Sequence, residues 1–218
     1  MHILKYAALA AMVVAGSANA ELVETDWLTD GDGLATLDTT TGLEWLDLTV
    51  TDSLSINEVS LELGEGGDYE GWRLPTAEEV EALIISYFGI TDYSEDVDTY
   101  TVDNSDELVD EWQYYFGESG ADGRSMGRYE NTSGDGSLAG TRDSGTIFIS
   151  YGTDDFDEAY RYYGVFLVSD GGTTLSSVLD PSINTPTNVP APVGLTLVGA
   201  LLGFGAFRGR RGNHLQPA

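Results

Sequence analysis

Cysteine is absent from the 218-residue chain, and histidine and lysine occur only near its ends, as His2, His214 and Lys5. Residues 21–188 therefore contain none of the three. Their absence excludes disulfide cross-links, histidine-based triads, cysteine nucleophiles and Schiff-base lysines, and it removes nearly every kind of zinc site. Carboxylates are the remaining catalytic option. We predict that the protein is not an enzyme and has no resident cofactor.

Positive charge is also scarce. All 37 acidic residues lie between Glu21 and Asp180, where only five arginines accompany them, so this stretch has a formal net charge of −32. The arginines are Arg73, Arg124, Arg128, Arg142 and Arg161. So much negative charge repels nucleic acids and anionic headgroups, and it suits a soluble domain in salt, where screening weakens self-repulsion. We expect no nucleic-acid partner.

The same carboxylates attract divalent cations, and two acidic segments are candidate calcium sites. They are Asp30 with Asp32, and the run from Asp154 to Glu158. EF-hand spacing fails at the first segment, because Leu34 stands where the third oxygen ligand belongs. Calcium binding is therefore a hypothesis, and general solubility is the simpler interpretation of the charge. We assign no set of metal ligands.

The first twenty residues are typical of a secretory signal peptide. Lys5 supplies positive charge, Tyr6 to Ala15 is apolar, and Ala18-Asn19-Ala20 has the small residues of a cleavage site. The apolar run is short for a membrane span. The sequence predicts export and removal of residues 1–20 by signal peptidase, with cleavage after Ala20.

Two segments carry strong helix-start signals. Both fit a capping box, Ser55 with Glu58 and Thr76 with Glu79. The second helix has apolar side chains at helical spacing, namely Val80, Leu83, Ile84, Tyr87 and Phe88. Gly89 is expected to end it. A third helix is predicted from Asp106 to Phe116.

Strand signals occur early and late in the chain. Residues 33–48 predict a hairpin that turns at Gly42, and the β-branched and aromatic runs 146–151 and 159–168 predict two late strands. We expect early and late strands to meet in one antiparallel sheet, which gives an α+β fold. Residues 118–145 are rich in Gly, Ser and Asp and form either a long loop or a set of short strands. Such segments are often binding surfaces.

Two motifs resemble the Lcl C-terminal-like domain family. The first is Thr-Gly-Leu-x-Trp, and the second is Trp-Arg-Leu-Pro-Thr leading into a Glu-rich helix. The matching residues are Thr41, Gly42, Leu43, Trp45, Trp72, Arg73, Leu74, Pro75, Thr76 and Glu79. Residues 163–168 are similar to the family's closing strand. The resemblance implies that residues 21–170 form a single C-type-lectin-like domain with an antiparallel sheet and two to three helices, in a secreted, surface-associated protein.

The second motif has a structural interpretation. Trp72 and Leu74 can fill the core, and Pro75 directs the chain into the helix that Thr76 caps. Arg73 needs a carboxylate partner, because it is the only cation in the first hundred exported residues. The calcium- and sugar-placing tripeptides of true C-type lectins, Glu-Pro-Asn, Gln-Pro-Asp and Trp-Asn-Asp, are absent. The cysteines of related formylglycine-generating enzymes are absent too.

The chain closes on a polar stretch and an apolar tail. Residues 171–188 are rich in Thr, Ser and Pro, which predicts a flexible linker. The run 193–207 has no charge and as a helix would span about 22 Å, less than a hydrocarbon core of about 30 Å. Arg208, Arg210 and Arg211 follow it, and the positive-inside rule keeps them cytoplasmic. The sequence predicts one marginal transmembrane helix.

The order of motif, glycine-rich apolar helix and arginine cluster over residues 189–211 resembles the PEP-CTERM sorting signal. Val189-Pro190-Ala191-Pro192 stands where that family has Val-Pro-Glu-Pro. The resemblance makes Val189, Pro190 and Pro192 recognition residues and the three arginines a retention cluster. It implies a membrane-bound exosortase that cuts near the motif, in Gram-negative bacteria that make extracellular polysaccharide. A permanent membrane anchor is the alternative.

These predictions combine into one function. The expected protein is an exported cell-surface or extracellular-matrix protein, anchored transiently in the inner membrane by residues 189–211, with residues 212–218 as a short tail. Its expected role is structural or adhesive, in a biofilm or exopolysaccharide setting. Two alternatives stay open. One is a calcium- or polysaccharide-binding module that uses residues 118–145, and the other is a carboxylate-dependent enzyme acting on glycans, for which the surplus of acids makes any one pair uninformative.

Overall fold

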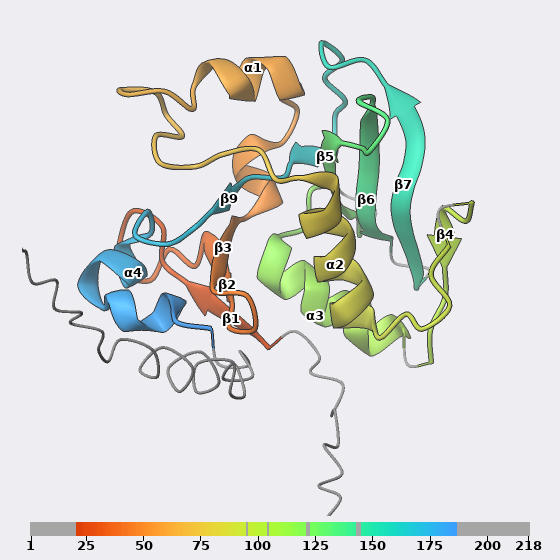
Figure 1. Cartoon of the computed structure of the whole chain (residues 1–218), viewed down its shortest axis with the longest axis horizontal. Helices are drawn as coiled ribbons and strands as arrows, with labels where there is room; N and C mark the ends of the chain where they lie inside the picture. Colours follow the sequence, from red (N-terminus) through yellow and green to blue (C-terminus); the bar gives the residue numbers. More distant parts are fainter. Residues whose placement is uncertain (1–20, 95, 104, 121–122, 143–144, 187–218) are drawn as a thin grey trace, which may run out of the picture. The chain divides into compact units, whose positions relative to one another are not determined.

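The structure, a computed structural model, describes residues 21–186 except 95, 104, 121–122 and 143–144. Its elements are β1 (Leu22–Thr25), β2 (Ala35–Asp38), β3 (Leu43–Leu46), η1 (Leu48–Thr51), α1 (Ile56–Leu61), α2 (Ala77–Phe88), β4 (Thr99–Tyr100), α3 (Ser105–Phe116), β5 (Ser125–Glu130), β6 (Gly136–Arg142), β7 (Thr146–Asp154), β8 (Gly164–Val165), β9 (Val168–Ser169), α4 (Leu175–Leu179) and η2 (Pro181–Asn184) (Figure 1). They form a mixed α+β fold, as predicted. None of these described helices is long and apolar enough to cross a membrane.

Four strands form a first sheet, in the order β1-β2-β3-β9, and all of its pairings are antiparallel. β2 and β3 are the predicted hairpin. β9 joins the edge of this hairpin, so that Trp45 pairs with Val168. Gly42 is required at the turn, because its φ is +79° and a β-carbon there would overlap the carbonyl oxygen of Asn184.

Five strands form a second sheet, in the order β4-β7-β6-β5-β8. β8 runs parallel to β5, whereas the other pairings are antiparallel. The prediction of one antiparallel sheet is therefore wrong, because early and late strands meet only where β3 pairs with β9. Of the two alternatives for residues 118–145, the strands are correct: β5 and β6 form a hairpin within this segment.

A short joining segment, residues 164–169, passes from the second sheet to the first. Its first two residues pair with β5 and its last two with β3. The predicted strand over residues 159–168 is thus shorter than expected and split in two. Its first half is not a strand because Tyr162 has a φ of +86°, and the Tyr162 amide donates to the carboxylate of Asp52 instead of to a neighbouring strand.

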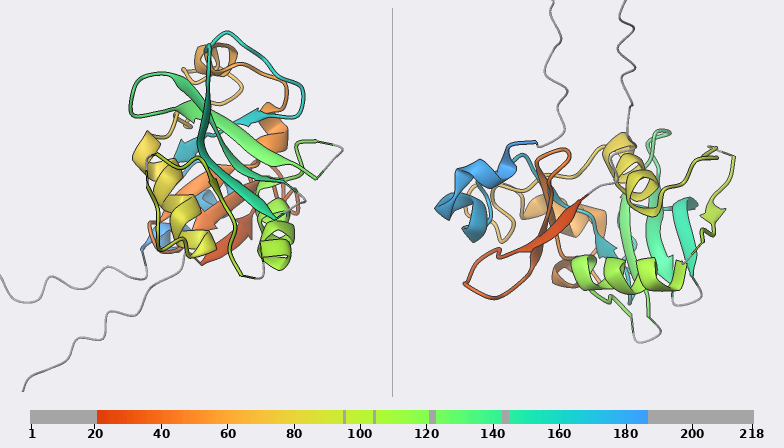
Figure 2. Two further views of the ribbon diagram at one scale, coloured as in Figure 1. Left: turned by 90° about the vertical axis from the view of Figure 1, so that its right-hand side faces the viewer. Right: turned by 90° about the horizontal axis from the view of Figure 1, so that it is seen from below.

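One hydrophobic cluster fills the space between the helices and the two sheets. α2 and α3 cover the face of the second sheet that presents Ile147 and Ile149, and the aromatic side chains of Trp112 and Phe116 are fully buried there (Figure 2). Phe166 reaches the same cluster from the joining segment. A second cluster forms beneath α1, around Trp27, Tyr69 and Trp72. A third, smaller cluster contains Met126, Leu138 and Phe148. All three clusters lie within residues 21–186.

The predicted helix starts are confirmed. Ser55 and Thr76 each accept a hydrogen bond from the amide three residues later, and the glutamate at that position completes a capping box. α2 ends at Gly89, which is left-handed with a φ of +64°. α3 begins at Ser105, one residue before the predicted start.

Residues 171–186 are folded, so the prediction of a flexible linker is wrong for this part of the segment. Thr174 caps α4 and donates a hydrogen bond of 2.5 Å to the buried carboxylate of Glu44. The amide of Leu175 donates to the carbonyl of Trp27 over 2.7 Å. These bonds hold α4 and η2 beside the first sheet (Figure 1). Residues 187 and 188 lie outside the described residues.

Candidate functional site

The motif segments of the family resemblance meet at Val168, which is fully buried. Trp45 of the first motif pairs with Val168 across β3 and β9. Arg73 of the second motif forms an isolated antiparallel bridge with Val168 on the other side, through two backbone hydrogen bonds of 2.9 Å. The closing segment is therefore held between the two motifs. Their shared role is to fix the path of the backbone.

The predicted carboxylate partner of Arg73 is confirmed, and there are two. The guanidinium donates to both carboxylate oxygens of Glu79, over 2.8 and 2.7 Å, and to Asp170 over 2.8 Å. Hydrogen bonds from Arg73 lower the pKa of both carboxyl groups, and in return they raise the pKa of Arg73. Arg73 thereby ties the first turn of α2 to the chain that follows β9.

The remaining residues of the second motif also serve the fold. Trp72 is buried, as predicted, and Thr76 caps α2. Pro75 is buried directly before this cap, whereas Leu74 is only half-buried.

An apolar cavity of about 350 Å³ lies between the Gly42 turn and α2. Thr41, Leu43 and Trp45 line one side, and Ala82 and Leu83 of α2 line the other. The indole nitrogen of Trp45 is buried and has no hydrogen-bond partner among the described residues. Asp38, Glu78 and Glu79 also line the cavity, but little of the surface that it exposes is polar and could orient a ligand.

A polar cavity of about 230 Å³ lies between α2, β7 and the turn that joins β5 to β6. The side chains that line it include Glu81, Tyr93, Asn131, Thr132, Ser150 and Thr153. They come from four separate segments of the chain. Convergence of polar groups from several elements on one concave site is the usual architecture of a small-ligand site.

Two register shifts between β6 and β7 build one wall of the polar cavity. Ile149 and Ser150 together face Ala139, and the next irregularity follows at Gly152 and Thr153. Ser150 has a φ of +52°, a value that non-glycine residues seldom adopt. Bulges of this kind bend a strand and re-aim its side chains, and strained backbone concentrates at functional sites.

A chain of hydrogen bonds fixes the carboxylate of Glu81 at this cavity. The amide of Ser150 donates to the Tyr129 hydroxyl over 3.1 Å, and the Ser150 hydroxyl donates to one oxygen of Glu81 over 3.0 Å. The Ser150 hydroxyl has only one hydrogen, so Tyr129 is the donor in the 2.9 Å contact between the two hydroxyls. Tyr93 donates to the other oxygen of Glu81 over 2.9 Å.

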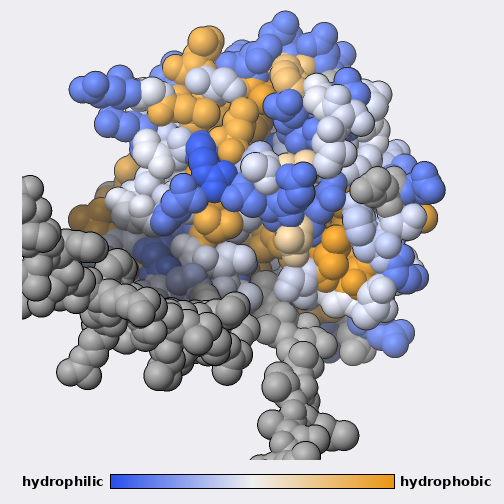
Figure 3. Space-filling view, viewed as in Figure 1, coloured by the Kyte–Doolittle hydropathy of each residue, from blue (hydrophilic) through white to orange (hydrophobic). Residues whose placement is uncertain are grey.

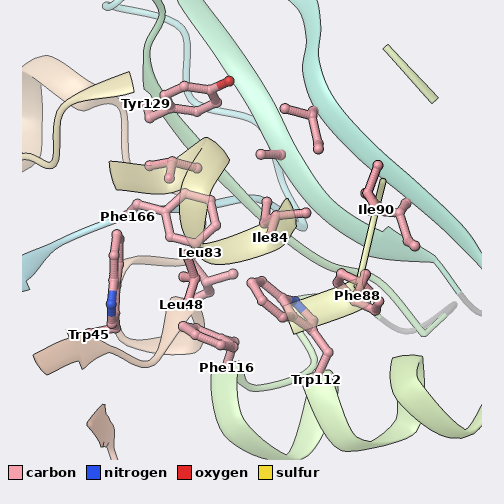
Figure 4. Close-up of a cluster of buried hydrophobic side chains, with 14 of the residues drawn as sticks. Trp45, Leu48, Leu83, Ile84, Phe88, Ile90, Trp112, Phe116, Tyr129 and Phe166 are labelled. Atoms are coloured by element: carbon pink, nitrogen blue, oxygen red, sulfur yellow. The ribbon is translucent and has the colours of Figure 1, made fainter. Parts of the chain in front are cut away.

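The two tyrosines at this cavity, Tyr93 and Tyr129, both have a raised pKa and stay protonated in neutral solution. Burial raises the pKa of Tyr93, and the hydrogen bond to Glu81 raises it further. Burial also raises the pKa of Tyr129. The ring of Tyr129 belongs to the main hydrophobic cluster, and its hydroxyl points out of that cluster (Figure 4). The hydroxyls of Tyr93 and Tyr129 therefore act as hydrogen-bond donors, to Glu81 and to Ser150 respectively.

In the first candidate calcium segment, Asp30 with Asp32, the carboxylate of Asp32 stabilises a turn. Both oxygens of the Asp32 carboxylate accept amide hydrogen bonds, from Trp27 over 2.9 Å, and from Leu28 and Thr29 over 2.9 and 2.8 Å. Burial works to raise the pKa of Asp32, but these hydrogen bonds outweigh it and the pKa is lowered. Within residues 21–186, gaps aside, no group of three or more metal-ligating side chains is placed to hold an ion. Calcium binding stays a hypothesis.

The predicted processing residues lie outside the described residues. These are Ala18, Ala20, Val189, Pro190, Pro192, Arg208, Arg210 and Arg211.

The sequence contains little that marks the polar cavity. Residues 131–133 fall in the segment that we interpreted as a binding surface, but Glu81 and Ser150 belong to a helix and a strand with ordinary apolar patterns. Only the register of β7 against β6 brings them together.

Comparison of the chain with protein-family models, with curated proteins and with solved structures finds no match.

Proposed function

We propose that this chain is an exported cell-surface or extracellular-matrix protein that is processed at both ends. In this proposal residues 1–20 are a signal peptide, and residues 189–211 are a PEP-CTERM-like sorting signal that anchors the chain in the inner membrane until an exosortase cuts it. The mature protein then has a structural or adhesive role and is not an enzyme.

The observation that carries the proposal is that the described fold lies wholly between the two proposed processing sites. Among the described residues the first strand begins at Leu22 and the last element ends at Asn184, whereas the expected cleavages are after Ala20 and near Val189. Both sheets and all three described hydrophobic clusters lie between these positions. Cleavage at the two predicted sites leaves this core intact.

The surface of the described domain is consistent with an extracellular location. Its charge is strongly negative, and blue hydrophilic residues cover much of the face in Figure 3. Its stability rests on buried side chains and hydrogen bonds, in a chain that contains no cysteine. Such a domain tolerates an oxidising, salty environment, because it has no thiol to oxidise and because salt screens its charge.

We assign the domain to a C-type-lectin-like, Lcl C-terminal-like architecture within the same proposal. The support is that both family motifs flank the closing segment at Val168, and that two helices pack against antiparallel strands. No sugar site follows from this architecture by itself, because the lectin tripeptides are absent.

Fractionation of cells that express tagged variants tests the proposal. Wild-type protein is expected outside the inner membrane as a shortened form. Combined substitution Pro190→Ala and Pro192→Ala is expected to leave a full-length chain in the inner membrane, since both changes remove proposed recognition residues. Pro217→Ala is the matched control, because it removes a proline beyond the arginine cluster. Equal processing of the double variant and the control would contradict the proposal.

A further inference from the structure

The polar cavity between α2 and β7 presents a fixed hydrogen-bond acceptor. Each oxygen of the Glu81 carboxylate accepts one hydrogen bond from the protein, from Ser150 or from Tyr93. A carboxylate oxygen can accept a second bond. Glu81 can therefore accept bonds from a ligand without giving up those that orient it, and a preorganised acceptor needs little ordering on binding.

The same cavity presents a fixed donor. The side-chain oxygen of Asn131 accepts hydrogen bonds from the amides of Ser133 and Asp135, over 2.9 and 3.1 Å. These bonds determine which end of the amide is oxygen and leave the NH₂ group of Asn131 for a ligand. The hydroxyl groups of Thr132 and Thr153 add further groups that both donate and accept.

Charge and size narrow the class of ligand. The cavity is lined by the carboxylate of Glu81 and by no cationic side chain, in a domain of strongly negative charge, so anionic ligands are disfavoured. One carboxylate is too few for a calcium site. A volume of about 230 Å³ lies below the roughly 300–1,000 Å³ of pockets for drug-sized ligands. The ligand must donate hydrogen bonds to Glu81 and accept one from the NH₂ group of Asn131, and a small, neutral molecule rich in hydroxyl groups does both.

We propose that this cavity binds one neutral sugar residue of a polysaccharide. Glu81 accepts hydrogen bonds from neighbouring sugar hydroxyls, the NH₂ group of Asn131 donates to a sugar oxygen, and Tyr93 forms part of the wall. The site uses no calcium, unlike that of the true C-type lectins. It goes beyond the proposed function and does not depend on cleavage of the tail, so either proposal can fail without the other.

Titration calorimetry on residues 21–188, which contain all three hydrophobic clusters, tests the ligand class. The probes are short oligomers of glucose, mannose and galactose, all in EDTA, and an oligomer of galacturonic acid as the anionic counterpart of the galactose probe. Binding of at least one neutral oligomer is expected. If galactose is the sugar bound, the galacturonic acid oligomer should bind at least about tenfold more weakly. Failure of every neutral oligomer to bind at millimolar concentration, or stronger binding of the acidic one, overturns the proposal.

Matched variants test the residues. Glu81→Gln removes the charge of the acceptor, and Asn131→Asp retains the oxygen that holds the turn but removes the NH₂ donor. Each is expected to weaken binding at least about tenfold. Glu107→Gln, at an exposed glutamate of α3 outside the cavity lining, should bind as the wild type does. Glu81→Gln and Asn131→Asp test the site independently. If one of these variants does not fold, the other still decides whether the cavity is the binding site. Wild-type affinity in a folded Asn131→Asp protein contradicts the assignment.

Discussion

The hydroxyl of Thr174 donates a hydrogen bond to the carboxylate of Glu44, which lies 130 residues earlier in the chain. Both side chains are completely buried, and the second carboxylate oxygen of Glu44 has no hydrogen-bond partner among the described residues. A buried carboxylate with so few partners depends strongly on each of them. This bond therefore fixes α4 to the first sheet and makes residues 171–186 part of the domain.

Replacement of Thr174 by valine should destabilise the protein by about 1–3 kcal/mol, because it leaves the carboxylate of Glu44 buried without its donor and removes the N-cap of α4. Urea unfolding followed by tryptophan fluorescence measures the change. Thr91→Val is the control at an exposed threonine and should shift stability by less than about 0.5 kcal/mol. Equal stability of the two variants would show that the segment is a linker after all.

Gly42→Ala should be more destabilising than Gly31→Ala. Both glycines have a positive φ, of +79° and +82°, so both substitutions add the strain of a left-handed alanine, about 1–2 kcal/mol. Only at Gly42 does the new methyl group also overlap the backbone of Asn184, since the space around Gly31 is open. The difference between the two urea midpoints measures the contact between the hairpin turn and η2, and identical midpoints would contradict it.

Arg73→Met should lower stability at neutral pH by about 1 kcal/mol, a modest value because the ion pairs are partly exposed to solvent. Arg161→Met is the control, because Arg161 is exposed and forms no ion pair with the residues that the structure describes. Thermal unfolding at pH 7 distinguishes the two variants. A control as unstable as Arg73→Met would assign the effect to loss of positive charge in general.

The ion pairs of Arg73 with Glu79 and Asp170 also make the stability of the protein depend on pH. The pKa values of Glu79 and Asp170 are lowered in the folded protein from ordinary values of 4.5 and 3.8. Their contribution to stability is therefore complete above those ordinary values and is lost as the pH falls through the folded pKa values. The stability difference between the wild type and Arg73→Met should shrink between pH 6 and pH 3. A difference that is constant over this range would contradict the assigned ion pairs.

Tyr129→Phe should destabilise the bulge in β7, because the Tyr129 hydroxyl accepts the amide hydrogen of Ser150 and an unsatisfied buried amide costs about 1–3 kcal/mol. Hydrogen exchange of the Ser150 amide, followed by NMR, should become faster. Tyr151→Phe, at a neighbouring exposed tyrosine, should leave this exchange unchanged. An unchanged exchange rate in Tyr129→Phe would contradict the claim that the Tyr129 hydroxyl holds the backbone of Ser150 in place.

Elements held by local contacts were predictable from the sequence. α2 begins at the capping box of Thr76 and ends at Gly89, as its pattern indicates, because each signal acts within a few residues of the boundary it sets. The early hairpin was predictable for the same reason. The carboxylate partners of Arg73 followed from charge alone, since no other cation stands near it in the sequence.

Elements held by distant contacts were not predictable. β5 and β6 are rich in Gly and Ser, and Gly140 is required because its φ is +129° and because a β-carbon would overlap the carbonyl of Ser125 on the neighbouring strand. α4 has five residues and little apolar pattern, and its main anchor is Glu44 in another element. The polar cavity depends on bulges whose position is set by strand register. None of these relationships has a local signal.

The intact mass of the protein recovered from outside the cell shows whether the chain is processed at both ends. The expected chain begins at Glu21 and ends near Pro190 to Pro192. A chain that is found only in the inner membrane and continues to Ala218 would contradict it.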